Sequence, residues 1–194
     1  MSSSDFVSNP PRFCPRCGGH LSERTVEMEE RPRLVCDQCQ RIFYINPKVV
    51  AGIIIERGGR LLLLRRSIEP RYGSWTFPAG FMEIDETAEE AAAREAEEEV
   101  GLTVKAGPLV GVYSRPAPEA PGILTVVFQG QKPKGPVKIG HEALEARWFA
   151  PDDIPWDDLS FETTQWALRD WLRAREDTRR RPQRAARRPP RRGG

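Results

Sequence analysis

The sequence of 194 residues has no apolar run that approaches the ~20 consecutive residues needed to cross a bilayer. Residues 1–13 also lack the apolar core of a signal peptide. A structured pattern begins directly after them, which argues against a transit peptide. Hydrophobic residues make up only 39% of the chain, because both ends are poor in core-forming patterns. These absences predict a soluble cytoplasmic protein with a flexible N-terminus, one substantial domain and a smaller one.

Cysteine is scarce, and the four cysteines form two pairs: Cys14 with Cys17, and Cys36 with Cys39. Eighteen residues separate the pairs, a spacing typical of zinc sites with four thiolate ligands. Two disulfides are the alternative, but a chain without a secretion signal keeps its thiols reduced. We therefore predict a zinc ribbon over residues 14–45 with a closed, structural site that supplies the folding energy of the ribbon. With four thiols present, we expect His20 at the surface.

Cations are almost absent from one acidic segment of the chain. Seven glutamates lie between Glu86 and Glu99, and Arg94 is the only cation among them. Thr87 and Glu90 match a helix capping box, and alanines, which favour helices, fill the middle of the segment. Gly101 follows where a helix commonly ends. The segment is therefore predicted to be a helix.

Three carboxylates share one face of this predicted helix, because Glu95, Glu98 and Glu99 stand at i, i+3 and i+4. They also lie at the negative C-terminal end of the helix dipole. Like charges at this spacing destabilise an isolated helix by about 0.2–0.5 kcal/mol per pair. A solvated face would interleave both signs of charge. With no neighbouring cation to offset them, we predict that they bind Mg²⁺ or Mn²⁺, which prefer oxygen ligands.

The segment from Gly80 to Leu102 fits the signature of the Nudix hydrolases at every defined position, and the chain resembles this family from about Pro47 to Arg175. The flanking sequences GSWTFPAG and HEALEARWF also resemble the family. The resemblance implies an α/β fold, a Nudix α/β/α sandwich with a mixed β-sheet, over residues 46–176. It also implies an enzyme that hydrolyses a phosphoanhydride with the help of bound divalent metal.

The resemblance assigns roles to individual residues. The implied Mg²⁺ ligands are the carbonyl of Gly80 and the carboxylates of Glu95, Glu98 and Glu99. Glu98 is favoured as the base that accepts the proton of the attacking water. Glu142 is a candidate auxiliary metal ligand, with Glu145 in reserve. The remaining charged residues are structural or solvated: Glu86 paired with Arg94, and Glu89, Glu90 and Glu97 in solvent.

The signature specifies the reaction but not the group linked to the nucleoside diphosphate. Among the Nudix enzymes with a zinc ribbon, the NADH pyrophosphatases carry the motif SQPWPFP after the signature. This chain has YSRPAPEAPGIL there, without tryptophan or phenylalanine. The ribbon-bearing ADP-ribose and FAD pyrophosphatases are more similar. We therefore expect ADP-ribose or FAD first, NADH second and oxidised nucleoside triphosphates third.

Candidate substrate contacts are basic and aromatic residues. Three arginines are candidates for the diphosphate or a ribose phosphate: Arg65, Arg66 and Arg71. Three aromatic residues are candidates for stacking on a base: Tyr44, Tyr72 and Trp75. Residues of these kinds are more often ordinary surface or core.

Hydrophobic patterning predicts the body of the domain. KVVAGIIIER and RLLLLRR are predicted to be two buried strands joined by a hairpin at Gly58 and Gly59. GPLVGVYSR and GILTVVFQG are predicted to be two more strands, joined by a proline-rich loop over residues 116–122. A C-terminal helix follows, with a predicted apolar face of Leu159, Phe161, Trp166, Leu168, Trp171 and Leu172.

Acidic residues are nearly absent from the C-terminal segment, Leu172 to Gly194. Its ten arginines and two acids give a net charge of +8, so the preceding residues must carry −6 for the whole chain to reach +2. We predict that residues 177–194 form a disordered Arg/Pro-rich tail. Such a tail is either solvated or in contact with nucleic acid or another anionic surface.

A function of another class is also consistent with these features: a nucleic-acid-binding zinc-ribbon protein that uses the Nudix domain as a scaffold. Two observations oppose it. The catalytic positions of the signature are all filled, and the charge of the ribbon from Cys14 to Cys39 is nearly balanced. The expected partners are a small nucleotide substrate and, as in many enzymes of this kind, a second copy of the chain in a homodimer.

Overall fold

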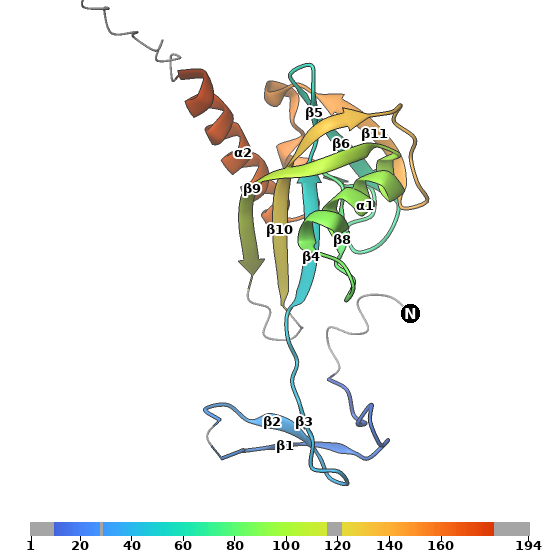
Figure 1. The fold of residues 1–194 in the computed structure, drawn as a ribbon, viewed down its shortest axis with the longest axis vertical. Helices are drawn as coiled ribbons and strands as arrows, with labels where there is room; N and C mark the ends of the chain where they lie inside the picture. Colours follow the sequence, from blue (N-terminus) through green and yellow to red (C-terminus); the bar gives the residue numbers. More distant parts are fainter. Residues whose placement is uncertain (1–9, 28, 116–121, 181–194) are drawn as a thin grey trace, which may run out of the picture.

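The computed structural model describes residues 10–27, 29–115 and 122–180. Figure 1 shows a small N-terminal ribbon below a larger α/β body. Three antiparallel strands form the ribbon sheet, in spatial order: β1 (Leu21–Arg24), β2 (Arg33–Cys36) and β3 (Ile42–Phe43). Phe13 pairs with His20 in an isolated bridge, and the N–H of Leu21 donates to the carbonyl of Arg12 at 2.8 Å. Residues 12 and 13 therefore belong to the ribbon, which corrects the prediction of a flexible end through residue 13.

Two four-stranded sheets form the body. The first contains, in spatial order, β8 (Ala79–Phe81), β4 (Lys48–Ile54), β10 (Ile123–Lys134) and β9 (Thr103–Arg115). Strands β4 and β10 are parallel and their neighbours antiparallel, so this sheet is mixed. The second contains β11 (Ala143–Phe149), β6 (Arg60–Arg66) and β5 (Glu56–Arg57), with β7 (Trp75–Thr76) also pairing with β6.

The chain passes from one sheet to the other at Ile55. The sequence predicted a single strand before the hairpin at Gly58 and Gly59, and this prediction was wrong. Strand β4 lies in the first sheet, whereas β5 forms the hairpin with β6 in the second. Both sides of this segment are covered: Ile53 and Ile55 lie in one core cluster and Ile54 in another. A continuous apolar run is what a strand buried on both faces requires, and such a run does not mark where the chain changes sheets.

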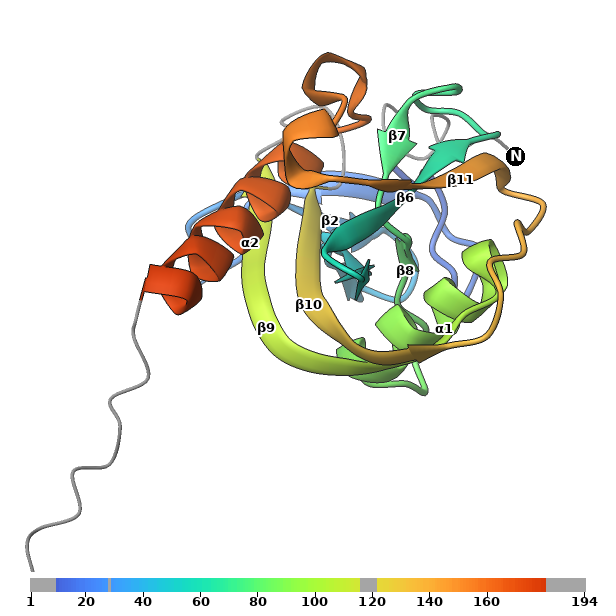
Figure 2. The same cartoon turned by 90° about the horizontal axis from the view of Figure 1, so that it is seen from above.

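The two helices cover opposite faces of this arrangement. Helix α1 (Ala88–Val100) packs into the cluster of Ile53, whereas α2 (Glu162–Arg180) packs into the cluster of Ile54. Figure 2 shows the two helices on separate sides of the sheets. Alternate residues of one strand face opposite sides, so the helices sandwich the sheets. The predicted α/β/α sandwich with a mixed sheet is confirmed.

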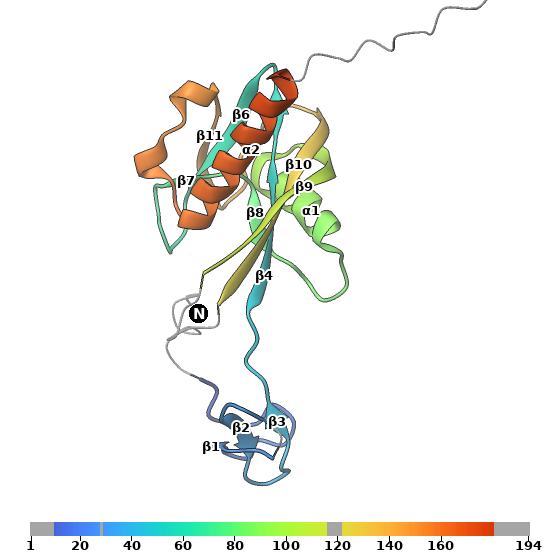
Figure 3. The ribbon, with the colours of Figure 1, turned by 90° about the vertical axis from the view of Figure 1, so that its left-hand side faces the viewer.

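Helix α2 packs against β9 (Figure 3) and differs from the prediction in two respects. Its buried face is formed by Ala167, Leu168 and Trp171, whereas Phe161 and Trp166 are 37% and 39% exposed. Phe161 precedes the helix, and a helical turn directs Trp166 away from the sheet. The helix also continues to Arg180, so residues 177–180 of the predicted tail are helical.

Two short 3-10 turns, η1 (Pro151–Asp153) and η2 (Trp156–Asp158), connect β11 to α2. The predicted proline-rich loop at 116–121 and the tail from residue 181 lie outside the described residues. Within the residues that the structure describes, no helix is both long enough and apolar enough to cross a membrane.

Candidate active site

Helix α1 is fixed at both ends by local contacts. Thr87 Oγ1 accepts from the N–H of Glu90 at 3.2 Å, and Glu90 Oε2 accepts from the N–H of Thr87 at 2.8 Å. Gly101 ends the helix in the left-handed region, with φ 68°. The predicted capping box and helix end are therefore confirmed. Between these fixed ends, the helical repeat determines the face on which each glutamate lies.

Two of the three predicted metal-binding carboxylates point into the protein. Glu95 and Glu99 are 8% and 4% exposed, whereas the side chain of Glu98 is 56% exposed. Glu99 Oε2 accepts from the N–H of Ala79 at 2.9 Å. The carboxylate of Glu95 lies against Gly80 so closely that a Cβ at this position would collide with it. A side chain at residue 80 would therefore displace the carboxylate of Glu95, and the structure brings Gly80 together with Glu95 and Glu99.

Arg94 connects the loop before α1 with the carboxylates on it. Its Nε and Nη2 donate to the two oxygens of Glu86 at 3.0 and 2.6 Å, and Nη2 also donates to the carbonyl of Phe81 at 3.1 Å. The predicted bracing pair of Glu86 and Arg94 is present. Nη1 donates to Glu95 Oε1 at 2.7 Å and to Glu98 Oε2 at 3.1 Å. The prediction that no cation offsets these carboxylates was therefore wrong, because a side chain at i reaches its neighbour at i+4.

The pKa shifts of the buried carboxylates show that the acidic groups influence one another. Burial, together with the charges of Glu95 and Glu142, raises the pKa of Glu99 to about 8, although the hydrogen bond from Ala79 lowers it. Burial also raises the pKa of Glu95, and the hydrogen bond from Arg94 opposes this shift. Glu142 raises the pKa of both groups, so this half-buried carboxylate lies near the same site. Buried carboxylates with raised pKa values are stabilised in their charged form by a cation.

The segment that carries Glu142 is held by Ser67, a residue that the sequence analysis did not identify. The N–H of Ser67 donates to the carbonyl of Glu142 at 2.9 Å, and its Oγ donates to the carbonyl of His141 at 2.7 Å. These bonds join the β6–β7 loop to the segment before β11. Ser67 and His141 are 74 residues apart in the chain. No local pattern in the sequence marks such a contact.

The predicted substrate arginines differ in their surroundings. Arg66 is half-buried, with its guanidinium 5.3 Å from the ring centre of Phe161 and its Nε donating to the carbonyl of Pro70 at 3.0 Å. Burial lowers the pKa of Arg66, whereas Glu99 and Glu142 raise it, which places its charge beside the carboxylates.

Arg65 is exposed and donates from Nε to the carbonyl of Gly73 at 2.7 Å; its Nη1 lies 3.5 Å from Glu145. Glu145, the reserve metal ligand, is also 3.1 Å from Arg147. Arg71 is exposed in the β6–β7 loop, with a left-handed φ of 69°.

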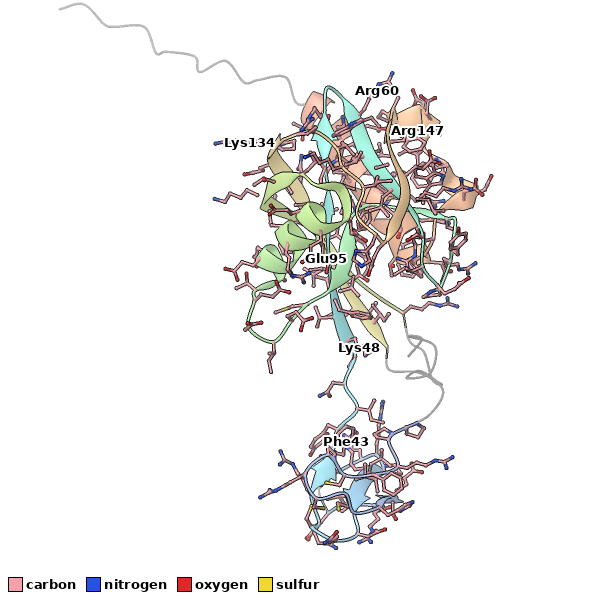
Figure 4. The ribbon with its side chains drawn as sticks, turned by 90° about the vertical axis from the view of Figure 1, so that its right-hand side faces the viewer. Phe43, Lys48, Arg60, Glu95, Lys134 and Arg147 are labelled. Carbon is pink, nitrogen blue, oxygen red and sulfur yellow. The ribbon has the colours of Figure 1, made fainter. Side chains whose placement is uncertain are left out.

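The aromatic candidates lie in three different environments. Trp75 is only 7% exposed and packs edge-on against Phe149, with ring centres 5.0 Å apart, so it is a core residue. Tyr72 is 59% exposed in the β6–β7 loop. Tyr44 directly follows β3 in the ribbon, where its hydroxyl donates to Glu29 at 2.9 Å. The structure does not bring Tyr44 together with the acidic site, since Figure 4 shows its neighbour Phe43 in the ribbon and Glu95 in the larger body.

The donor set on α1 fits a divalent cation. Carbonyl and carboxylate oxygens are the ligands that Mg²⁺ and Mn²⁺ prefer. The carboxylates are not fully converged, since only the four cysteines form a group of three or more possible ligands within 4.8 Å in the described part of the chain. Arg94 holds Glu95 and Glu98 on one side, while the N–H of Ala79 holds Glu99 on the other.

The four cysteines converge in the ribbon. Sγ of Cys14 lies 3.8 Å from that of Cys39, and Sγ of Cys17 lies 3.5 Å from that of Cys36. All four are free thiols whose sulfur atoms lie within 4.8 Å of one another. A hydrogen bond from the N–H of Cys39 is the main reason that the pKa of Cys36 falls to about 6. This favours the thiolate, which is the form that binds zinc. His20 lies outside the cluster, with Nδ1 3.4 Å from Asp37.

Comparison with known families agrees with this geometry. The model of the NUDIX domain family matches residues 46–172. The chain belongs to the Nudix family. A second family model, described as Nudix N-terminal and representing the Nudix zinc ribbon, matches residues 12–45. The chain is thus a Nudix hydrolase with an N-terminal zinc-ribbon domain.

Individual relatives extend this assignment. The Nudix hydrolase is 37% identical over 131 residues to an ADP-ribose pyrophosphatase from Methanocaldococcus jannaschii, covering 67% of this chain and 76% of that one. It is 35% identical over 146 residues to the NAD-capped RNA hydrolase NudC from Salmonella heidelberg, covering 74% of this chain but only 53% of NudC. A crystal structure of a Nudix hydrolase from Nitrosomonas europaea superposes with a TM-score of 0.80 at 37% identity, covering 86% of this chain and 93% of that one.

Proposed function

We propose that this Nudix hydrolase cleaves the phosphoanhydride of a nucleoside diphosphate linked to another group, in a reaction that depends on Mg²⁺ or Mn²⁺. ADP-ribose and FAD are the first candidate substrates, and NADH and related nicotinamide dinucleotides are the second. The observation that carries the proposal is the burial of Glu95 against Gly80 and of Glu99 against the N–H of Ala79, with the charges of Glu142 and Arg66 acting on Glu99. A hydrolase needs such a concentration of oxygen ligands beside a cationic side chain to bind and cleave a charged diphosphate.

A bound divalent cation neutralises charge on the phosphate oxygens and lowers the pKa of water. Its proposed ligands are the carbonyl of Gly80 and the carboxylates of Glu95, Glu98 and Glu99, with Glu142 as the auxiliary ligand. Glu98 is also the preferred base, because its exposed carboxylate is the most accessible to an attacking water. Arg66 is the proposed contact of a phosphate oxygen, and Arg65 and Arg71 are proposed contacts farther along the substrate.

The relatives support the order of substrates. The 37% identical relative is named for ADP-ribose, which favours this substrate. The NudC relatives add NAD-capped RNA to the nicotinamide-containing candidates. FAD rests on the sequence resemblance alone. The homodimer and the cytoplasmic location stay predictions.

A substrate panel tests the proposal. Purified protein with Mg²⁺ is incubated with ADP-ribose, FAD, NADH and nucleoside triphosphates, and nucleoside monophosphate release is measured. We expect the highest kcat/KM for ADP-ribose or FAD and no turnover with chelator. The alternative is a nucleic-acid-binding protein that uses the Nudix domain as a scaffold. It would be supported if the protein hydrolysed none of these compounds and bound nucleic acid with an affinity that weakens with salt.

A further inference from the structure

The zinc ribbon carries a groove that the proposed hydrolysis does not use. Its volume is about 400 Å³. The lining residues come from the first cysteine turn and from β3 with its flanks: Cys14, Pro15, Arg16, Arg41, Ile42, Phe43 and Tyr44. The groove is thus an apolar strip with Arg41 at one end of β3, Tyr44 at the other end, and Arg16 contributed by the cysteine turn.

The structure separates charges that are nearly balanced along the ribbon sequence. Arg24 pairs with Asp37, and Arg33 pairs with Glu29 at 2.7 Å. In contrast, Arg16 and Arg41 form no ion pair with any of the described residues. Both line the groove. The groove is therefore more basic than the composition of the ribbon indicates, and it is complementary to an anionic ligand.

The other end of the groove presents an aromatic ring in a fixed position. Tyr44 is 48% exposed, and its hydroxyl donates to Glu29 at 2.9 Å. The guanidinium of Arg33 lies 5.3 Å from the ring centre and covers one side of the ring. Arg41 and Tyr44 are separated by β3, about 10 Å at the rise of an extended strand. An aromatic ring that lines the same groove as two guanidiniums without an ion pair to the described residues suits the base and phosphates of a nucleotide.

We propose that this groove binds a nucleotide of a single-stranded RNA chain, with a base against Tyr44 and phosphates against Arg16 and Arg41. Unpaired bases expose the faces that stack on aromatic rings, which favours single-stranded over duplex ligands. The groove lies in the ribbon, apart from the body that contains Glu95 (Figure 4). The choice of RNA rests on the proposed function, in which NAD-capped RNA is a candidate substrate, whereas binding at the groove does not require hydrolysis.

Fluorescence anisotropy with the full chain tests this site. The probe is a labelled, unstructured RNA of roughly 12 nucleotides, long enough for one groove and its flanks, without added Mg²⁺. We expect Arg16→Gln/Arg41→Gln to raise Kd about tenfold and to reduce the slope of log K against log salt by about 1.4, for two lost phosphate contacts. Arg31→Gln removes one positive charge, half of that removed by the double variant, from an exposed ribbon position outside the groove and should leave Kd unchanged within about twofold.

Ring variants test the aromatic end. Tyr44→Leu should raise Kd about tenfold, whereas Tyr44→Phe keeps the stacking surface and should bind almost as wild type. Zinc content is measured for every variant, so that loss of the ribbon is not mistaken for loss of the groove. Deletion of residues 181–194 in each background removes binding by the arginine-rich tail.

The outcomes are distinct. RNA affinity that survives Arg16→Gln/Arg41→Gln but disappears with residues 181–194 would overturn the groove. Two results together would identify the groove as an acidic-peptide site and also overturn the proposal. Oligoglutamate would displace the RNA at equal charge concentration, and Tyr44→Leu would leave the Kd for RNA unchanged. ADP-ribose hydrolysis is assayed separately and should be unchanged in Arg16→Gln/Arg41→Gln. Its absence from the wild type would reject the proposed function without affecting the binding result.

Discussion

Arg94 Nη1 donates to Glu98 Oε2 at 3.1 Å across one turn of α1. The same nitrogen contacts Glu95. In the absence of metal, one guanidinium therefore offsets part of the repulsion within the carboxylate face. Repulsion between the glutamates and attraction to Arg94 act in opposite directions on helix stability, and a neutral substitution removes both.

Glu98→Gln should therefore change the metal-free free energy of unfolding by no more than about 0.5 kcal/mol. Turnover of ADP-ribose should fall by orders of magnitude, because the cation loses a ligand and water its base. Mg²⁺ should raise the Tm of the wild type more than that of the variant. Thermal denaturation with and without Mg²⁺, beside a turnover assay, measures all three. Glu97→Gln, on the solvent side of the same helix, is the control and should behave as wild type; an active Glu98→Gln enzyme would contradict the assignment.

Glu99 should make metal-free stability depend on pH. Its pKa rises from 4.5 in the ordinary case to about 8 in the folded protein, mainly through burial. A raised folded pKa means that its stabilising contribution is complete below pH 4.5 and is lost as the pH rises through 8. The Tm of metal-free wild type should therefore fall between pH 6 and about 9 by more than that of Glu99→Gln. Equal slopes for the two proteins would show that Glu99 is not the titrating group.

Mg²⁺ should reverse this pH trend in the wild type. The cation binds the charged carboxylate, so the stability gained from Mg²⁺ should be larger at pH 8.5 than at pH 6. Glu99→Gln should show a smaller gain at both values. Tm measured across a Mg²⁺ titration at each pH provides the comparison.

Ser67 should act on the reaction through the position of Glu142. Ser67→Ala removes the hydrogen bond to the carbonyl of His141, worth about 1 kcal/mol. We expect the Mg²⁺ concentration for half-maximal activity to rise several-fold, with a smaller Mg²⁺-induced increase in Tm. Ser67→Thr keeps the hydroxyl and should restore both values. If Ser67→Ala destabilised the fold but left the Mg²⁺ dependence unchanged, the residue would be purely structural.

The cysteine cluster should contain one equivalent of Zn²⁺ that supports only the ribbon. Cys36→Ser should abolish zinc binding and unfold residues 12–45, while the hydrolase body keeps a cooperative transition and most ADP-ribose turnover. Metal analysis and calorimetry measure these effects. Less than about half an equivalent of zinc in the purified wild type would count against the site.

Features determined by neighbouring residues were predictable from the sequence. The capping box and Gly101 delimit α1, and they set the face on which Glu95 and Glu99 lie. The cysteine pairs likewise predicted their own convergence, because each pair lies on one tight turn. Hydrophobic patterning predicted strands within β9 and β10, and the structure pairs them as antiparallel neighbours.

Features that depend on distant segments were not predictable. The hydrogen bonds from Ser67 to the segment of Glu142 join residues far apart in sequence, and no periodicity encodes them. The change of sheet at Ile55 is concealed because the segment is apolar on both faces. The partner of Tyr44 depends on the β1–β2 turn that brings Glu29 beside it. The role of Arg94 as a cation that offsets the carboxylates was also missed. Its contact with Glu98 follows from helix geometry, but the set of four acceptors that it contacts does not.

The inward face of α1 has a consequence for how this enzyme can diversify. Ala91, Ala92 and Ala96 are fully buried beside Glu95 and Glu99. Interiors at crystal-like density have no space for an added methylene, so a larger residue at any of these alanines would move the carboxylates away from Gly80. Solvent-facing positions of the helix such as Glu97 can be exchanged without this effect, whereas changes of substrate preference are expected in the loops around the helix. The inward face of the helix is thus the part of the site that tolerates larger side chains least.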